Sequence, residues 1–279
     1  MSRLPRLLLL CLLLAGCANV SLQEVRDFAG ESAEMGGYAD LAQRFRDTYQ
    51  RERPYLAPTV AALAEANDAR RQAAYDDFHR LQHAVVLYMQ TLDALAGATR
   101  YDLSAQVDGL TAGITANPEL GISAAHVQAY AGLTRLLLRI SLSNYQANAV
   151  QELVRDGDAD LQLLLAAMTN LMRLFDKTNA NEQKTVLEFF DVQLRYLTHP
   201  QDRLLAAIAR AQYQAKDKEY RLIAQRYSLA EQGLAKIALG HRALHAHLDE
   251  MTTPEVRQMA VGVVRDLRMI RAGLVNNQL

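Results

Sequence analysis

Residues 161–175 read LQLLLAAMTNLMRLF, and their apolar side chains recur at steps of three and four residues. This spacing places them on one face of an α-helix, because a helix completes one turn every 3.6 residues. Similar spacing recurs along most of the chain, and no segment shows the strict alternation of a half-buried strand. The sequence therefore predicts an all-α protein.

Prolines, glycines and capping residues divide this pattern into separate helices. The expected helices cover residues about 19–51 (with a weak point at Gly36-Gly37), 58–95, 123–155, 161–175, 186–197, 202–248 and 254–275. Residues 156–158 are interpreted as a turn. In residues 176–185 a break is favoured over a continuous helix, because Asn179 and Glu182 have the spacing of a capping box. Short polar connectors favour an elongated bundle of long antiparallel amphipathic helices, in which Leu63, Leu204, Leu205 and Ile208 are candidate core positions.

The first sixteen residues differ in character from the rest. Arg3 and Arg6 precede an apolar run from Leu7 to Leu14. That run is much shorter than the ~20 residues of a transmembrane helix. It suits the apolar region of a cleaved signal peptide, which the helical bundle then follows.

The end of this segment, Leu14-Ala15-Gly16-Cys17, resembles the lipobox of bacterial lipoprotein precursors. The resemblance implies that the bond between Gly16 and Cys17 is cleaved and that the Cys17 sulfur carries a diacylglyceryl group. A lipid-bearing cysteine implies a membrane anchor in the cell envelope, with the protein on the periplasmic face of a membrane. An Asp directly after the cysteine favours retention in the inner membrane. The residue at this position is Ala18, which favours the outer membrane.

Three segments follow from these observations: a signal peptide at 1–16, a lipidated N-terminus and first helix at 17–55, and a helical bundle at 56–279. Removal of Arg3 and Arg6 with the signal peptide leaves 28 basic and 31 acidic residues, a net charge of −3. This charge balance does not predict the clustered basic surface that binds nucleic acid. Since Cys11 is also removed and Cys17 is acylated, the mature body has no free thiol and must be stabilised by packing alone.

Two histidine groups have a spacing that could place metal ligands on one helix face. One group is Asp76, His79 and His83, and the other is His241, His245 and Asp249. A polar helix edge accounts for the first group without a metal, and the favourable interaction of cationic side chains with a helix C-terminus accounts for the second, although the groups could meet across the bundle. We therefore expect no metal site and no cofactor.

Other surface patterns have ordinary structural interpretations. Tyr213, Tyr220 and Tyr227 are spaced by seven and suit the margin of a core better than an aromatic binding platform. The basic-aromatic segment 44–55 could contact anionic lipid but more simply forms a solvated helix face. The alanine pairs at 124–125 and 206–207 are weak candidates for the lining of a ligand cavity.

The leading functional hypothesis is a non-enzymatic interaction or scaffolding protein of the cell envelope, with an envelope protein as its partner. The chain has no nucleophile elbow, no His-Glu-x-x-His pair and no P-loop, so an enzyme has no support in the sequence. One alternative is a periplasmic bundle that binds or senses a small ligand between its helices. Another is an immunity lipoprotein that neutralises a toxin.

The anchor is directly testable by the substitution Cys17→Ser. Because the acylated atom is the cysteine sulfur, the variant should be released from membranes or remain uncleaved. Membrane fractionation and metabolic labelling with a fatty acid measure the two outcomes. Unchanged lipid labelling of the variant would contradict the assignment.

Overall fold

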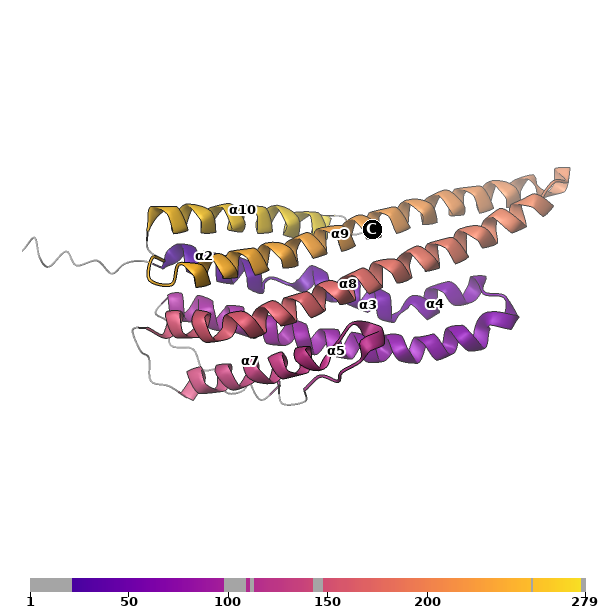
Figure 1. Ribbon diagram of the computed structural model, residues 1–279. Helices are drawn as coiled ribbons and strands as arrows, with labels where there is room; N and C mark the ends of the chain where they lie inside the picture. Colours follow the sequence, from indigo (N-terminus) through magenta and orange to yellow (C-terminus); the bar gives the residue numbers. More distant parts are fainter. Residues whose placement is uncertain (1–21, 98–108, 111–112, 143–147, 252, 277–279) are drawn as a thin grey trace, which may run out of the picture.

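The structure is a computed structural model that describes residues 22–97, 109–110, 113–142, 148–251 and 253–276. Within these ranges the regular elements are all helical, so the all-α bundle predicted from the sequence is confirmed. Figure 1 shows long helices lying side by side in an elongated body. The predicted signal peptide and the Gly16–Cys17 bond lie outside the described residues.

The helices differ widely in length, and the longest pair forms one antiparallel hairpin. The bounds are α2 Gln23–Ala33, α3 Gly36–Arg46, α4 Thr48–Glu52, α5 Pro58–Ala96, α7 Ala124–Leu142, α8 Ala149–Tyr196, α9 Arg203–Ala246 and α10 Pro254–Asn276, with short 3-10 turns η1 Arg53–Tyr55, η2 Pro118–Leu120 and η3 Pro200–Asp202. Within these bounds, no helix combines the length and apolar content needed to cross a bilayer.

The expected ends of three helices agree closely with the structure. Helices α5 and α10 begin at Pro58 and Pro254. Proline does not destabilise a helix at this position, because the N–H groups of the first turn have no acceptor within the helix. Helix α9 runs to Ala246 after the turn that Pro200 begins. The expected first helix, in contrast, is divided: α2 ends at Ala33 and α3 restarts at Gly36. The weak point predicted at Gly36-Gly37 is therefore a complete break.

The turn predicted at residues 156–158 is wrong, because these residues lie inside α8. Each of the three residues that suggested a turn contacts a neighbouring helix instead. Asp156 forms an ion pair with Arg139 of α7, and Asp158 forms a hydrogen bond with His241 of α9. Gly157 lies against the ring of Tyr88 from α5. The chain does change direction earlier, between the end of α7 at Leu142 and the start of α8 at Ala149.

The break favoured at residues 176–185 is also wrong, and α8 is continuous through 48 residues. The two residues of the expected capping box are buried at helix contacts. The Asn179 amide lies 3.4 Å from the Tyr220 carbonyl of α9, and Glu182 forms an ion pair with Arg51 of α4. Polar side chains that would end an isolated helix are stabilised here by partners on neighbouring helices.

The core lies in the part of the bundle where α8 meets α5, α7 and α9. Its largest buried side chains include Tyr88, Phe78, Phe175 and Tyr227. A second, smaller cluster joins Val186, Phe190 and Tyr220 farther along the α8–α9 hairpin, with Tyr55 packed against it.

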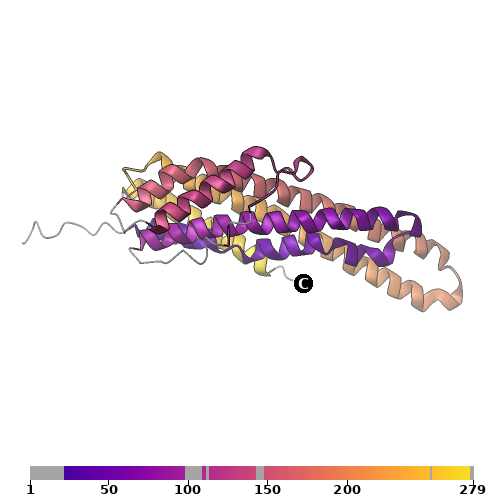
Figure 2. The same ribbon diagram turned by 90° about the horizontal axis from the view of Figure 1, so that it is seen from below.

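Beyond this point the α8–α9 hairpin splays away from α4 and α5 and projects past them (Figures 1 and 2). Helix α2 lies at the other end of the body, beside the α9–α10 connection (Figure 1). Near that connection, Arg257 of α10 is 3.8 Å from Glu24. Four predicted core residues are corrected in consequence, because none of the described elements covers them: Leu63, Leu204, Leu205 and Ile208 are all exposed.

The contact between Gly157 and Tyr88 predicts a position that does not tolerate a side chain. A Cβ atom at residue 157 would lie 2.5 Å from Cε2 of the Tyr88 ring. The ring is buried and cannot swing away, so Gly157→Ala should lower the free energy of unfolding by about 1–3 kcal/mol. Urea denaturation measures the change.

Gly262→Ala in α10 is the matched control, because a Cβ atom there meets nothing within 4 Å. With no clash to offset the better helix propensity of alanine, the control should be neutral or stabilising by up to about 1 kcal/mol. Equal stability of the Gly157 variant and the control would refute the packing argument.

Candidate functional site

The first histidine group is spread over a polar helix surface. Asp76 and His79 are exposed, and His83 is half-buried. Burial and the neighbouring His79 lower the pKa of His83, which keeps its imidazole neutral near pH 7. The His79 ring instead lies beside that of Tyr75, with 6.2 Å between ring centroids.

The second group separates in the structure. His241 is fully buried, His245 is half-buried and Asp249 is exposed. Among the residues that the structure describes, no three His, Cys, Asp or Glu side chains are grouped so as to hold a metal ion. This applies to each histidine group by itself and to the two taken together.

His241 has a different set of partners, which joins three long helices. Its Nε2 atom lies 2.7 Å from the Tyr88 hydroxyl of α5, and its Nδ1 atom lies 2.8 Å from Oδ1 of Asp158 in α8. The Tyr88 hydroxyl is also 3.0 Å from the Leu153 carbonyl, and the Gln162 amide donates to Asp158. This Tyr–His–Asp cluster crosses the middle of the bundle.

Burial lowers the pKa of His241 more than its contact with Asp158 raises it, so the neutral imidazole is favoured. In that form Nδ1–H donates to Asp158, and Nε2 accepts the Tyr88 hydroxyl proton. A second proton on His241 would require Tyr88 to donate to the Leu153 carbonyl instead. The hydrogen bond from His241 lowers the pKa of Asp158, and burial raises the pKa of Tyr88. Tyr88 and His241 are buried in the core and Asp158 lies at its margin, and the contacts among them join the three helices.

The tyrosine stripe is part of the packing, but only Tyr213 lies at the core margin that the sequence predicted for all three. Tyr220 and Tyr227 are fully buried and Tyr213 is half-buried. The Tyr227 hydroxyl donates to the Leu41 carbonyl of α3, and that of Tyr220 donates to Glu182.

The basic-aromatic segment 44–55 likewise joins helices. Arg44 is 2.9 Å from Glu219 of α9, and the Arg46 guanidinium lies over the Tyr75 ring. Figure 1 places α3 and α4 along the body and away from the start of α2. Arg44 and Arg46 therefore lie against α9 and α5, away from the start of α2.

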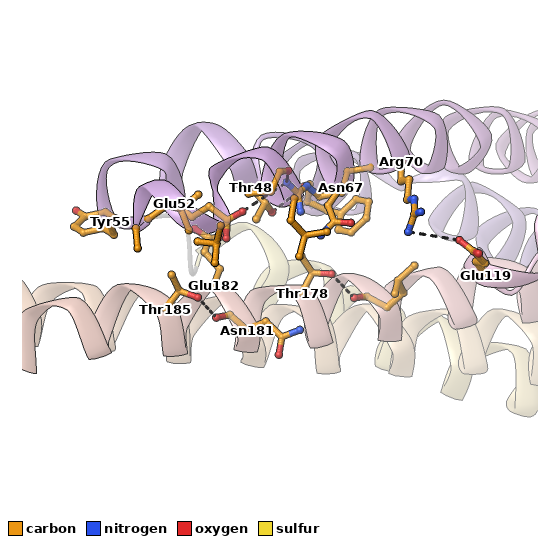
Figure 3. Close-up of a pocket in the computed structure, with 18 of the residues that line it drawn as sticks. Thr48, Glu52, Tyr55, Asn67, Arg70, Glu119, Thr178, Asn181, Glu182 and Thr185 are labelled. Atoms are coloured by element: carbon orange, nitrogen blue, oxygen red, sulfur yellow. Dashed lines mark hydrogen bonds and ion pairs between the residues drawn. The ribbon is translucent and has the colours of Figure 1, made fainter. Parts of the chain in front are cut away.

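A groove of about 530 Å³ runs between the α4–α5 segment and α8 (Figure 3). One wall carries the polar side chains Thr178, Asn181 and Thr185 of α8, and η2 closes one end with Glu119. The other wall is apolar toward the start of α5 and includes Leu56, Val60 and Leu63. The alanine pairs considered from the sequence, 124–125 and 206–207, do not line it.

The floor of the groove holds two charged groups with different environments. Glu182 is completely paired: both its carboxylate oxygens accept hydrogen bonds from Arg51, at 2.9 and 2.8 Å, and Oε1 also accepts one from Tyr220. Arg71 is only 9% exposed, yet its Nε atom has no hydrogen-bond partner. Its nearest carboxylate atoms, on Glu52 and Asp68, are 3.6 and 3.7 Å away, beyond ordinary hydrogen-bond distance.

The sequence did not single out Arg71 or this groove. Arg71 sits in a run of polar residues on α5, where the spacing alone suggests a solvated face. Its side chain lies beside Glu52 of α4 and lines the groove together with Thr178 and Glu182 of α8, a helix that is distant in sequence. The half-buried carboxyl of Glu52 is a further consequence: burial raises its pKa, and Arg71 only partly counters this.

Comparison of this chain with protein-family models, with curated proteins and with solved structures finds no match.

The lowered pKa of His241 predicts a specific dependence of stability on pH. The unfolded chain binds a proton at His241 below about pH 6.5, whereas the folded chain resists it. Stability should therefore fall as pH decreases through this range, by at most about 1.4 kcal/mol per pH unit for this one group. Urea denaturation from about pH 7 to about pH 5 measures the slope.

His241→Gln should be less stable at neutral pH but should have a shallower slope than the unaltered protein. His247→Gln, the same change at an exposed histidine of the α9 end, serves as the control and should retain the original slope. Identical slopes for the His241 variant and the unaltered protein would show that His241 does not contribute to acid sensitivity.

Proposed function

We propose that the protein is a lipid-anchored, non-enzymatic interaction protein of the cell envelope that presents the α8–α9 hairpin to a helix of a partner protein. The observation that carries the proposal is a set of exposed apolar side chains on the projecting end of α9. Leu204 is 73% exposed and Ile208 is 57% exposed. Exposed apolar side chains that follow a regular spacing indicate a surface that another molecule covers.

The spacing on α9 is that of a coiled-coil seam. Leu204, Ile208, Ala211 and Ala215 follow one another at steps of four, three and four residues, and all are exposed. We call these four residues the α9 seam. It lies about half a turn from Ala206, Tyr213 and Tyr220, which face α8. Packing against α8 therefore leaves the seam available.

The residues beside the α9 seam define the kind of partner. Leu205, Ala207, Gln212 and Gln214 occupy the flanking positions, and none of them carries a charge. Pairing is therefore not selected by ion pairs along the edge, and the two alanines allow close approach of a second helix. These features suit an amphipathic helix with an apolar seam and uncharged flanks.

The position of the seam agrees with an anchor at Cys17. Helix α2 begins six residues after Cys17, at the end of the body opposite to the hairpin tip (Figure 1). Helix α9 has 44 residues, and at 1.5 Å per residue it spans about 65 Å. A protein anchored through its N-terminus would hold the seam far from the membrane surface, where it could meet a partner on another layer of the envelope.

The proposal predicts that a charge on the seam abolishes partner binding and leaves the fold intact. Ile208→Glu places a carboxylate on an exposed surface, so the stability of the protein should change by less than about 0.5 kcal/mol. Crosslinking in intact envelopes, from a photoreactive residue placed at Gln212, should give a discrete adduct with the unaltered protein and none with the variant.

Val261→Glu is the matched control, because Val261 is exposed to a similar degree, 56%, on α10. The control should retain the adduct in full. A seam variant that crosslinks as well as the control would refute the role of the α9 seam.

A further inference from the structure

We propose that the partner helix on the α9 seam is α9 of a second copy of this chain, paired in the antiparallel direction to give a homodimer with two-fold symmetry. This inference rests on the proposed function and names the partner of the same surface. Three observations support it: the order of large and small residues along the seam, the uncharged flanks, and the place where α10 ends on α9.

The α9 seam has its two large residues at one end and its two small residues at the other. Leu204 and Ile208 come first, and Ala211 and Ala215 follow. The four positions are symmetric about a point between residues 209 and 210, so a two-fold axis there pairs the ends of the seam. Leu204 then lies opposite Ala215 of the second copy, and Ile208 lies opposite Ala211. Each layer joins one large and one small side chain, which lets the two helices interdigitate.

Parallel pairing of the same two seams does not give this fit. It would place Leu204 against Leu204 and Ile208 against Ile208 at one end, and alanine against alanine at the other. The large side chains would hold the helices apart, and the alanine layers would leave unfilled space between them. The order of side chains along the seam therefore selects the antiparallel direction.

The flanks of the seam are compatible with a second copy of themselves. In an antiparallel pair with two-fold symmetry, each flank faces the same flank of the other copy. One flank carries Leu205 and Gln212, and the other carries Ala207 and Gln214. No charge on a flank therefore meets its own copy. The partner helix required by the proposed function has an apolar seam and uncharged flanks, and α9 itself has both.

Helix α10 shows that a neighbouring helix packs well on this side of α9. Leu229 and Lys236 come fourteen and twenty-one residues after Ala215, so they lie on about the same side of α9 as the seam. Both contact α10: a Cβ atom on Gly273 would lie 2.7 Å from the Leu229 side chain, and Lys236 is 2.6 Å from Asp266. Helix α10 ends partway along α9 (Figure 1). The seam therefore continues the face that α10 covers.

The length of α9 beyond the end of α10 is sufficient for the second copy. Asn276, the last residue of α10, comes three residues after Gly273 and so lies near the level of residue 226 of α9. The two-fold axis places the first residue of the second α9, Arg203, at the level of residue 216. About 15 Å of α9 separates these two levels, which leaves room for the η3 turn of the second copy. The two bodies point in opposite directions from the axis, so they do not collide.

The test is disulfide formation in intact envelopes, from cysteines placed at two exposed seam positions. The double variant Leu204→Cys/Ala215→Cys should give a disulfide-linked dimer on a non-reducing gel, because the two positions face each other across the antiparallel pair. Neither single variant should do so, since its two cysteines would lie about 16 Å apart along the dimer. The two positions are equally far apart within one chain, so an internal disulfide cannot compete. Dimers from the single variants as abundant as those from the double variant would overturn the antiparallel arrangement.

Exchange of a large and a small residue tests the fit of the layers in the same double-cysteine variant. Adding Ala211→Ile places two isoleucines in each central layer, so formation of the disulfide-linked dimer should slow by about tenfold or more. Adding Ile208→Ala as well restores one large and one small residue to each layer and should restore the original rate. An exchange variant that dimerises as slowly as the one with Ala211→Ile alone would refute the pairing of Ile208 with Ala211.

The photocrosslink at Gln212 distinguishes failure of this inference from failure of the proposed function. A second copy as the partner gives an adduct with twice the mass of the mature chain. An adduct of any other mass, together with no disulfide-linked dimer of the double-cysteine variant, would refute self-pairing and leave the seam as a surface for another protein. No adduct and no dimer would refute both.

Discussion

Long apolar stripes pack almost equally well in several registers, because hydrophobic burial has no direction, whereas a buried hydrogen bond forms at one spacing only. In this protein the contacts among Tyr88, His241 and Asp158 connect α5, α9 and α8 near the middle of the bundle. Sliding any one helix by a turn would leave buried polar groups without partners. Gly157 belongs to the same arrangement, since the Tyr88 ring lies where its side chain would be. The positions of the groove and of the projecting hairpin both depend on this register.

The sequence predicted the fold class and the starts of α5 and α10, because helical spacing and proline position are local signals. It failed where polar residues have a tertiary role. Asp158 and Glu182 look like helix-ending residues in isolation, but a histidine on α9 and an arginine on α4 stabilise them inside α8. Partners of this kind are far away in the chain, so a local pattern cannot reveal them.

The surfaces were harder to predict than the helices. Apolar residues at helical spacing fit a core face equally well whether or not a neighbouring helix reaches them, and at Leu204 and Ile208 none of the described helices does. The groove depends on how α4, α5 and α8 diverge. The spacing of apolar residues within any one of these helices does not predict this divergence. Arg71 was missed for the same reason: its burial comes from the packing of helices around it and not from its neighbours in sequence.

Helix α8 crosses from a region with several packed neighbours into one where α9 is its main support. The free energy needed to open a backbone hydrogen bond should therefore decline along this single helix, from a high value near Met168 to a low value near Tyr196. Amide hydrogen exchange would then record the hairpin end as a separate, more easily opened unit joined to a slowly exchanging body. A molecule that binds at the hairpin end would slow amide exchange there before it slowed exchange elsewhere in the protein. The exchange rate of the hairpin end would therefore show whether a molecule is bound to it.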